Sequence, residues 1–317
     1  MRNLKRALSL ALAAIMLIGM MVVSASATGL DDFSDKDKVV NKDAVSMLVS
    51  LGIIEGKPDG SYAPTENVDR AQMAKMLSVI MNKGVDNSAL YQSVNSGLTD
   101  ITSHWAKGHI NYCYTTGIIA GRGTGTFDPS ATVTALEAAK MLLVAVGYDP
   151  KIEGFEGADW AINVSVRADE QGIFEGFTKD LSAPLNRDDA ALLIYNALDV
   201  EMIQSYTTNN YPIAYSDHRT ILADKYGVIK VQGVVVANEW ASLASDDGDA
   251  ALKEGKTTIY NGEGIFSTTG NTTVSKEDAS LKTQTFNVST PVDMLGKTVN
   301  LYIKKTTILA DSTVYGD

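Results

Sequence analysis

The feature that most constrains this chain is an internal repeat. Residues 52–77 read "GIIEGKPDGSYAPTENVDRAQMAKML", and residues 117–142, 65 positions further on, read "GIIAGRGTGTFDPSATVTALEAAKML". A weaker third copy lies within residues 155–198. A short unit repeated in this way cannot bury its apolar face alone, so we expect the copies to pack against one another.

Internal spacing supports the third copy. Trp105 precedes Gly117 by 12 residues and Trp160 precedes Gly172 by 12, whereas the same position of the first copy holds Val40. The second helix is expected to start 18 residues after the glycine in the first two copies and 15 residues after it in the third. The third copy has therefore lost three residues from its middle loop and kept both helices.

Each copy predicts a helix, a turn-rich loop and a second helix. Apolar residues recur with the helical period in the first segment, and the glycine after it stands where a left-handed residue ends a helix. Turn residues follow, as in Pro58–Gly60, and then an aromatic residue, Tyr62 or Phe127, which we expect to pack the loop against its own helices. Capping boxes at 69–72 and 134–137 predict where the second helix begins.

The residue that follows each cap differs between copies. It is Arg70 in the first, Ala135 in the second and Arg187 in the third. At the first helical position, both arginines are expected to face outward beside the loop. Each is either a solvated helix residue or a cation retained for a ligand, and its recurrence in the same capping frame favours the ligand.

The repeats also divide the chain. We expect repeats at residues 28–84, 97–148 and 155–200, and a polar linker at 201–224. Runs rich in Val, Ile and Thr within 225–317 predict a small, mostly antiparallel β-domain of five or six strands. The expected fold class is multidomain α + β. No obvious final element ends the sequence, so this domain either closes there or continues in a longer protein.

The first 27 residues have the pattern of a secretory signal peptide. Arg2, Lys5 and Arg6 precede an apolar stretch, and Ala-Ser-Ala follows it before Thr28. Because the apolar stretch approaches the length that spans a membrane, an uncleaved membrane anchor is the alternative. The small residues at the expected cleavage site disfavour it. No later segment is long and apolar enough to span a bilayer. We expect an exported protein with no membrane span after cleavage.

Charge and cysteine content narrow the classes of partner. The formal net charge is −11, and cleavage of three basic residues makes it −14 (27 − 3 = 24 basic against 38 acidic). Such a chain does not attract nucleic acid or anionic lipid through its overall field, so an anionic polymer must meet locally placed cations. Cys113, the single cysteine, lies in a helical apolar pattern and is expected to be a buried, inert thiol.

The sequence contains no recognisable catalytic constellation, so we expect no enzyme. His104, His109 and His218 are not spaced as metal ligands, and none of the common hydrolase or phosphate-loop motifs occurs. "GRGTG" at 121–125 lacks the Lys-Ser/Thr of a phosphate loop. The acidic residues within 246–249 form either a solvated loop or a calcium site, and the EF-hand spacing is absent. No cofactor is expected beyond this weak calcium option.

The repeats resemble the S-layer homology domain of bacterial surface proteins. Matching segments are "FSD" at 33–35, "LTD" at 98–100, "HWA" at 104–106 and "VDRAQMAKML" at 68–77, the last standing for the family's Thr-Arg-Ala-Glu helix start. The resemblance covers about residues 29–200. It implies a pseudo-threefold helical prism with grooves between neighbouring repeats. It also implies non-covalent attachment to secondary cell-wall polymer on peptidoglycan, often through a pyruvylated sugar.

The resemblance further implies binding residues. These are the helix-start arginine, an aspartate near the repeat start, the tryptophan and glycines of the loop. In this chain they are Arg70, Arg187, Asp35, Asp100, Trp105, Trp160, Gly60 and Gly125. A guanidinium fork suits a carboxylate-bearing sugar, and the helix N-terminus is expected to add N–H donors beside it. An aromatic ring offers a flat apolar platform to a sugar, although core packing is the alternative for both tryptophans.

Three departures from the family pattern limit the number of sites. Ala135 replaces the arginine in the second repeat, Val40 the tryptophan in the first, and Phe155 the aspartate in the third. If each groove needs an arginine, at most two grooves are competent.

Three functions follow as hypotheses. The first is a cell-wall anchor for an exported S-layer lattice protein, with self-association into that lattice, or for another surface cargo. The second is a cell-surface glycan hydrolase whose catalytic part lies in the β-domain or beyond residue 317. The third is a β-domain that itself binds carbohydrate.

Overall fold

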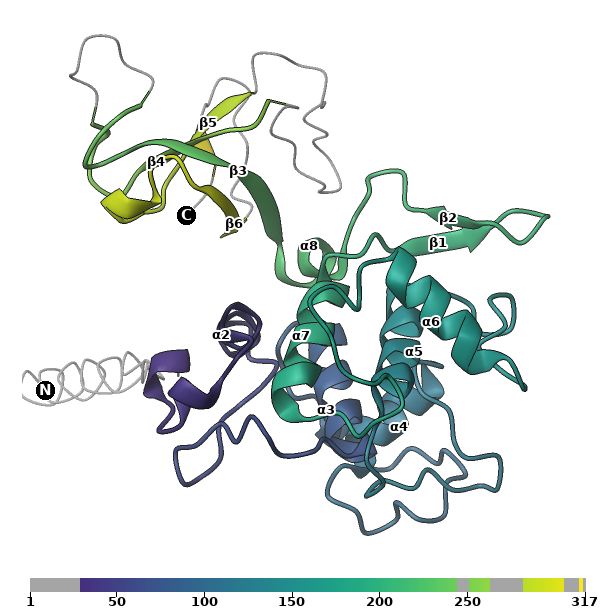
Figure 1. Cartoon of the computed structure of the whole chain (residues 1–317). Coiled ribbons are helices and arrows are strands. Elements are labelled where there is room, and N and C mark those ends of the chain that lie inside the picture. Colours follow the sequence, from purple (N-terminus) through teal and green to yellow (C-terminus); the bar gives the residue numbers. More distant parts are fainter. Residues whose placement is uncertain (1–28, 244–250, 263–281, 305–313, 316–317) are drawn as a thin grey trace, which may run out of the picture.

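The structure is a computed structural model that describes residues 29–243, 251–262, 282–304 and 314–315 (Figure 1). Within these residues it is a mixed α and β protein with seven α-helices and two sheets. The expected signal peptide and the acidic residues within 246–249 lie outside the described residues.

Six of the helices form three pairs, one in each repeat. They are α2 (Lys42–Ser50) and α3 (Arg70–Met81), α4 (Lys107–Thr115) and α5 (Ala135–Val146), and α6 (Trp160–Glu170) and α7 (Arg187–Leu198). The short 3-10 turns are η1 (Leu30–Asp32), η2 (Lys36–Lys38) and η3 (Ser88–Tyr91). The second helices begin where the caps predict: Asp69 and Thr134 form complete capping boxes, and Asn186 accepts a hydrogen bond from the Asp189 N–H.

The helices pack mainly between repeats (Figure 1). Helix α4 of the second repeat packs on α3 of the first, α6 of the third packs on α5 of the second, and α2 of the first packs on α7 of the third. The second helix of each repeat thus receives the first helix of another, and this order closes on itself. Helix α5 also packs against both α3 and α7.

A closed ring of three backbone hydrogen bonds lies at the centre of the helical part. Its members are the residues that directly precede the three caps, Val68, Val133 and Leu185, all buried. Val68 N–H donates to Leu185 C=O (2.8 Å), Leu185 N–H to Val133 C=O (2.7 Å), and Val133 N–H to Val68 C=O (2.9 Å). A buried N–H left unpaired costs about 1–3 kcal/mol, so no repeat can leave the ring without a penalty.

The core confirms the expected burial of the loop aromatics and the cysteine. Tyr62 and Phe127 are buried in the large helical core. Cys113 is also buried, with Sγ 3.4 Å from the Ala74 carbonyl oxygen, and burial raises the pKa of this thiol. Its low thiolate content at neutral pH makes it an inert packing residue.

Residues 201–224, expected to be a linker, contain secondary structure. Strands β1 (Ile203–Tyr206) and β2 (Pro212–Ala214) form an antiparallel hairpin, and helix α8 (Ile221–Tyr226) follows. The Thr220 side chain caps α8, and the apolar pair Ile221 and Leu222 is buried in the helical core. This segment therefore belongs to the packed helical part.

The second sheet forms the expected β-rich part. Its strands are β3 (Val228–Asn238), β4 (Thr257–Tyr260), β5 (Thr283–Phe286), β6 (Thr298–Lys304) and β7 (Val314–Tyr315), and the 3-10 turn η5 (Val292–Met294) precedes β6. The order is β6-β3-β4-β5-β7. All pairs are antiparallel except β5 with β7, which is parallel, so the sheet is mostly antiparallel as expected. A separate small core of Val235, Ile259, Phe286 and Leu301 supports it.

His109 joins the first two repeats and makes their stability depend on pH. It is buried on α4, with Nδ1 2.6 Å from Ser78 Oγ on α3 and Nε2 3.6 Å from Asp86 Oδ2. Burial lowers the pKa of His109 although Asp86 opposes the shift. Because its pKa is lower in the folded than in the unfolded chain, protonation favours unfolding.

We therefore expect the free energy of unfolding to be highest above about pH 6.5, the ordinary pKa of histidine, and to fall as the pH drops below it. Denaturant unfolding between about pH 8 and pH 5.5 measures this change, since carboxylates titrate mostly below that window. In His109→Gln, the plot of unfolding free energy against pH should be flatter. His104 and His218, present in both proteins, are the internal control. Equal pH dependence in both proteins would contradict this assignment.

Candidate functional site

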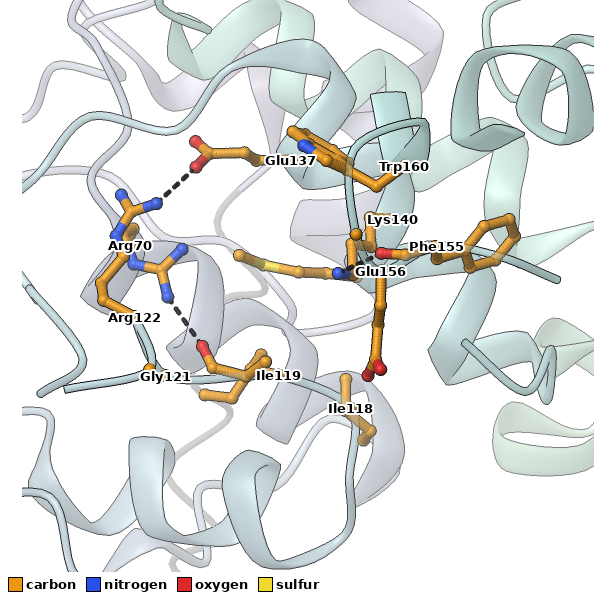
Figure 2. Close-up of a pocket in the computed structure, with 14 residues that line it drawn as sticks. Arg70, Ile118, Ile119, Gly121, Arg122, Glu137, Lys140, Phe155, Glu156 and Trp160 are labelled. Carbon is orange, nitrogen blue, oxygen red and sulfur yellow. Dashed lines mark hydrogen bonds and ion pairs between the residues drawn. The ribbon is translucent and has the colours of Figure 1, made fainter. Parts of the chain in front are cut away.

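Two grooves open at corresponding places on the helical part. We call the one lined by the loop after α4 the large groove; its volume is about 600 Å³. Figure 2 shows it with Arg70, Arg122, Glu137, Lys140 and Trp160 around its rim. The small groove is lined by the loop after α2 and has about 190 Å³.

The two grooves are built from equivalent residues. Ile118, Ile119, Gly121, Arg122, Glu137, Lys140 and Met141 of the large groove correspond to Ile53, Ile54, Gly56, Lys57, Gln72, Lys75 and Met76 of the small one, 65 positions earlier. Trp160 of the next repeat completes the large groove, and Trp105 completes the small one. The remaining repeat contributes the arginine, Arg70 or Arg187, so each groove draws on all three repeats.

The arginines are held in the same way in both grooves. Arg70 Nε donates to the Phe127 carbonyl (2.8 Å) and Nη2 to that of Ala120 (2.9 Å), with the guanidinium 4.3 Å from the centre of the Phe127 ring. Arg187 repeats this arrangement on the first repeat, with Nε 2.8 Å from Tyr62 O and Nη2 3.0 Å from Glu55 O. Each arginine therefore fixes the aromatic loop of another repeat.

The expectation that Arg70 faces outward is wrong. Its side chain is only 4% exposed, because the chain before α3 lies in the central ring and directs the first helical residue into the second repeat. The expectation that the helix start offers free N–H donors also fails for α3. Arg70 N–H donates to the Ala131 carbonyl (2.9 Å) and Ala71 N–H to that of Pro129 (3.0 Å).

The expected aspartates and glycines build the loops and do not line either groove. Asp35 carboxylate oxygens accept the N–H groups of Tyr62 and Ala63, at 2.7 and 2.9 Å. Asp100 accepts those of Phe127 and Asp128 in the same way, and although burial opposes the shift, these bonds lower the pKa of Asp100. They support the loop backbone where Ala63 and Asp128 adopt positive φ.

Gly60 and Gly125 serve the loop turns. Their φ angles are +80° and +76°, which glycine tolerates best. Their carbonyls accept the N–H groups of Ser34 (3.0 Å) and Thr99 (2.9 Å), which fasten the loops to the starts of their repeats.

The tryptophans, in contrast, lie in the grooves. Trp105 is 56% exposed, which argues against a pure core role. Trp160 is partly buried against the core, and Lys140 Nζ lies 5.6 Å from the centre of its ring. The Trp160 ring therefore lies beside a cation, and the exposed Trp105 ring lies beside His104 and His109.

Sequence reasoning missed the lysines of the grooves. Lys75 and Lys140 line the small and the large groove, five residues after the start of α3 and α5. The recurrence of lysine in the first two copies and Leu192 in the third was the available signal. Helical spacing placed these lysines on a surface but did not show which surface, because the groove wall comes from another repeat.

Burial disfavours the charged forms of two cationic side chains in the large groove. The pKa of Arg70 is lowered to about 10, mainly by burial and also by the charge of Arg122. Burial likewise lowers the pKa of Lys140. Arg122 is paired with Glu137 at 2.9 Å, whereas Arg70 and Lys140 have no carboxylate within ion-pair distance among the described residues. An anion in the groove would offset this cost.

The third equivalent position keeps a pocket of about 310 Å³, with Val40 and Leu192 in its lining, but has lost the arginine, the tryptophan and the lysine. Pro129 and Leu181 hold equivalent positions in their loops. The N–H of Ala71, the second residue of α3, donates to the Pro129 carbonyl, and the N–H of Leu136, the second residue of α5, donates to the Leu181 carbonyl. Two residues earlier, Lys179 therefore stands where Phe127 stands in the second repeat. Ala135, with no side chain to reach this loop, replaces the arginine there. Val40 and Leu192 replace the tryptophan and the lysine.

Other kinds of site are not found in the described part of the chain. Within residues 29–243, 251–262, 282–304 and 314–315, no group of three or more His, Cys, Asp or Glu side chains is placed to hold a metal ion. None of the helices described there is long and apolar enough to cross a membrane.

Residues 32–74 and 97–139 match the family model of the S-layer homology domain. These are the first two repeats up to the first turns of α3 and α5, and they include the loop walls of both grooves. These two segments of the chain therefore match S-layer homology domains.

Similar proteins are much longer than this chain. It is 27% identical to a cell surface protein of Thermoanaerobacter kivui over 84% of this chain and 32% of that protein. It is 33% identical to an S-layer protein of Bacillus licheniformis over 36% of this chain and 12% of the relative. An amylopullulanase of Thermoanaerobacterium thermosulfurigenes is 30% identical over 50% of this chain and 9% of that enzyme. The chain thus spans about a third or less of these relatives.

We expect that restoring the arginine at the third position does not restore the arrangement seen in the other two grooves. Ala135 is fully buried, and in Ala135→Arg the guanidinium would meet Lys179 in place of an aromatic ring. Overpacking should lower the free energy of unfolding by about 1–3 kcal/mol in denaturant titrations. Ala89→Arg, at an exposed site, is the control and should leave stability within about 0.5 kcal/mol. An Ala135→Arg protein as stable as the parent would contradict this explanation.

Proposed function

We propose that the repeats bind an anionic cell-wall polymer in the two grooves and thereby attach an exported protein to the wall. The observation that carries the proposal is the joint occurrence of arginine, tryptophan and lysine in both grooves, and their joint loss at the third position. Packing alone does not require these three residue types to be retained and lost together.

The groove chemistry suits a sugar with a carboxylate. Arg70 uses two of its five N–H donors on carbonyl groups, which leaves three without a hydrogen-bond partner among the described residues. A carboxylate can accept two of these in a charge-assisted pair. Lys140 adds a second positive charge and Trp160 an apolar platform for the ring. A pyruvylated sugar of secondary cell-wall polymer, as the family resemblance implies, carries such a carboxylate.

The arrangement of the repeats supports the proposal. The cyclic order of helix contacts and the central ring of hydrogen bonds support a pseudo-threefold unit with grooves between repeats. The family match and the names of the relatives support an exported cell-surface or cell-wall protein. Relatives named S-layer protein also favour self-association of the whole protein into a surface lattice.

A second candidate is attachment of a glycan-active enzyme. Its support is the names of three partial relatives, an amylopullulanase, an exoglucanase and a cell wall amidase. In that case the catalytic residues lie beyond residue 317 or in the β-rich part, and the repeats keep the same anchoring role.

The direct test is co-sedimentation with purified wall sacculi. We expect the mature protein to pellet with intact walls and to remain in the supernatant once the secondary polymer has been chemically stripped from the peptidoglycan. Serum albumin, another acidic protein, serves as the control for trapping. Equal pelleting with intact and stripped walls would contradict binding to the polymer.

The groove residues are tested by substitution. Lys140→Leu copies the natural Leu192 and should weaken wall binding by about tenfold, the equivalent of about 1.4 kcal/mol for one lost ionic contact. Lys151→Leu, an exposed site outside the groove, is the matched control. Arg70→Lys together with Arg187→Lys keeps the charge and removes the fork, so it should weaken binding further. Thermal unfolding of each variant shows whether the fold survives; unchanged binding by both groove variants would refute the site.

A further inference from the structure

The two grooves are equivalent in residues but not in size. The large groove, at about 600 Å³, falls within the 300–1,000 Å³ typical of pockets for drug-sized ligands, and the small groove, at about 190 Å³, falls below it. A disaccharide is drug-sized, whereas a single sugar ring is half of that. The difference in volume therefore predicts ligands of different length.

The cause lies at the start of the third repeat. In the second repeat, Asp100 stands five residues before Trp105 and binds its own loop, so this repeat contributes only Trp105 to the small groove. In the third repeat, Phe155 takes that place and the loop is three residues shorter. Phe155, Glu156 and Gly157 line the large groove instead.

The charges differ in the same direction. In the small groove, Lys75 Nζ lies 3.3 Å from Glu55 Oε2. In the large groove, Ala120 takes the place of Glu55, and Lys140 donates to the Phe155 carbonyl. A cation without a carboxylate partner binds an incoming anion with less competition.

Glu156 adds a carboxylate at a position where the small groove has none. Its side chain is exposed at the rim and has no ion-pair partner among the described residues. The equivalent residue of the second repeat, four positions before Trp105, is the buried Ile101. The Glu156 carboxylate attracts Lys140 and repels an anion, but it accepts hydrogen bonds from sugar hydroxyls, so it suits a neutral ring next to the charged one.

We propose that the large groove is the principal site and holds an anionic glycan segment of two sugar rings, whereas the small groove holds one ring. The charged group lies at Arg70 and Lys140, the first ring on Trp160, and the second ring along Phe155–Gly157 with its hydroxyls on Glu156. This inference rests on the proposed wall binding.

The tryptophans allow each groove to be observed separately. Trp105→Phe with Trp240→Phe leaves Trp160 as the reporter of the large groove, and Trp160→Phe with Trp240→Phe leaves Trp105 for the small one. The probes are one-ring and two-ring fragments of polymer released from the walls with which the mature protein sediments, at constant ionic strength. Fluorescence titration gives the dissociation constant Kd for each groove.

The Trp160 reporter should bind the two-ring fragment about tenfold more tightly than the one-ring fragment, and the Trp105 reporter less than about threefold more tightly. In the Trp160 reporter, Glu156→Ala should reduce the tenfold gain to about threefold without weakening one-ring binding. Glu254→Ala, an exposed acid of the β-rich part, is the control.

This inference would be overturned if the second ring increased the affinity equally in the two reporters. It would also be overturned if Glu156→Ala left that increase unchanged in the Trp160 reporter. Either result would leave wall binding itself intact. A mature protein that fails to sediment with intact walls would instead refute the proposed function, and this inference with it.

Discussion

The helical part depends on the ring of backbone hydrogen bonds that joins Val68, Val133 and Leu185. Each bond connects two repeats, and each member directly precedes the cap of a second helix. The first residue of that helix is thereby directed into the loop of another repeat. This is how Arg70 reaches the Phe127 loop and Arg187 the Tyr62 loop. A groove is therefore a product of the closed assembly, and no single repeat contains one.

The arginine that is missing from the second repeat has a physical explanation within the chain. Where the facing loop has an aromatic residue, Tyr62 or Phe127, an arginine covers its ring. The loop that Ala135 faces has Lys179 at that position, paired with Asp189, so an arginine there would find no ring to cover. The arginines thus have two tasks. They fix the loop through carbonyl acceptors, and in the proposed function their further N–H donors bind the ligand.

Much of this architecture was predictable from local sequence signals. Caps and glycines marked the helix ends, and the departures at Ala135 and Val40 predicted that at most two grooves carry the full residue set. The partners of each helix were not predictable, because apolar periodicity shows which face is buried and not what covers it. For the same reason the burial of Arg70 and the groove position of Lys140 were missed. Asp35 and Asp100 look like ligand residues in sequence, yet their carboxylates are occupied by loop N–H groups.

The central claim is that the three repeats form one closed unit, so that both grooves exist only together. Amide hydrogen exchange of Val68, Val133 and Leu185, followed by NMR under native conditions, tests this most directly. If the ring opens only when the whole helical part unfolds, the three amides exchange with the same free energy, equal to that of global unfolding. Exchange of one of them at a clearly lower free energy, with the other two still protected, would show that a repeat detaches alone and would contradict the claim.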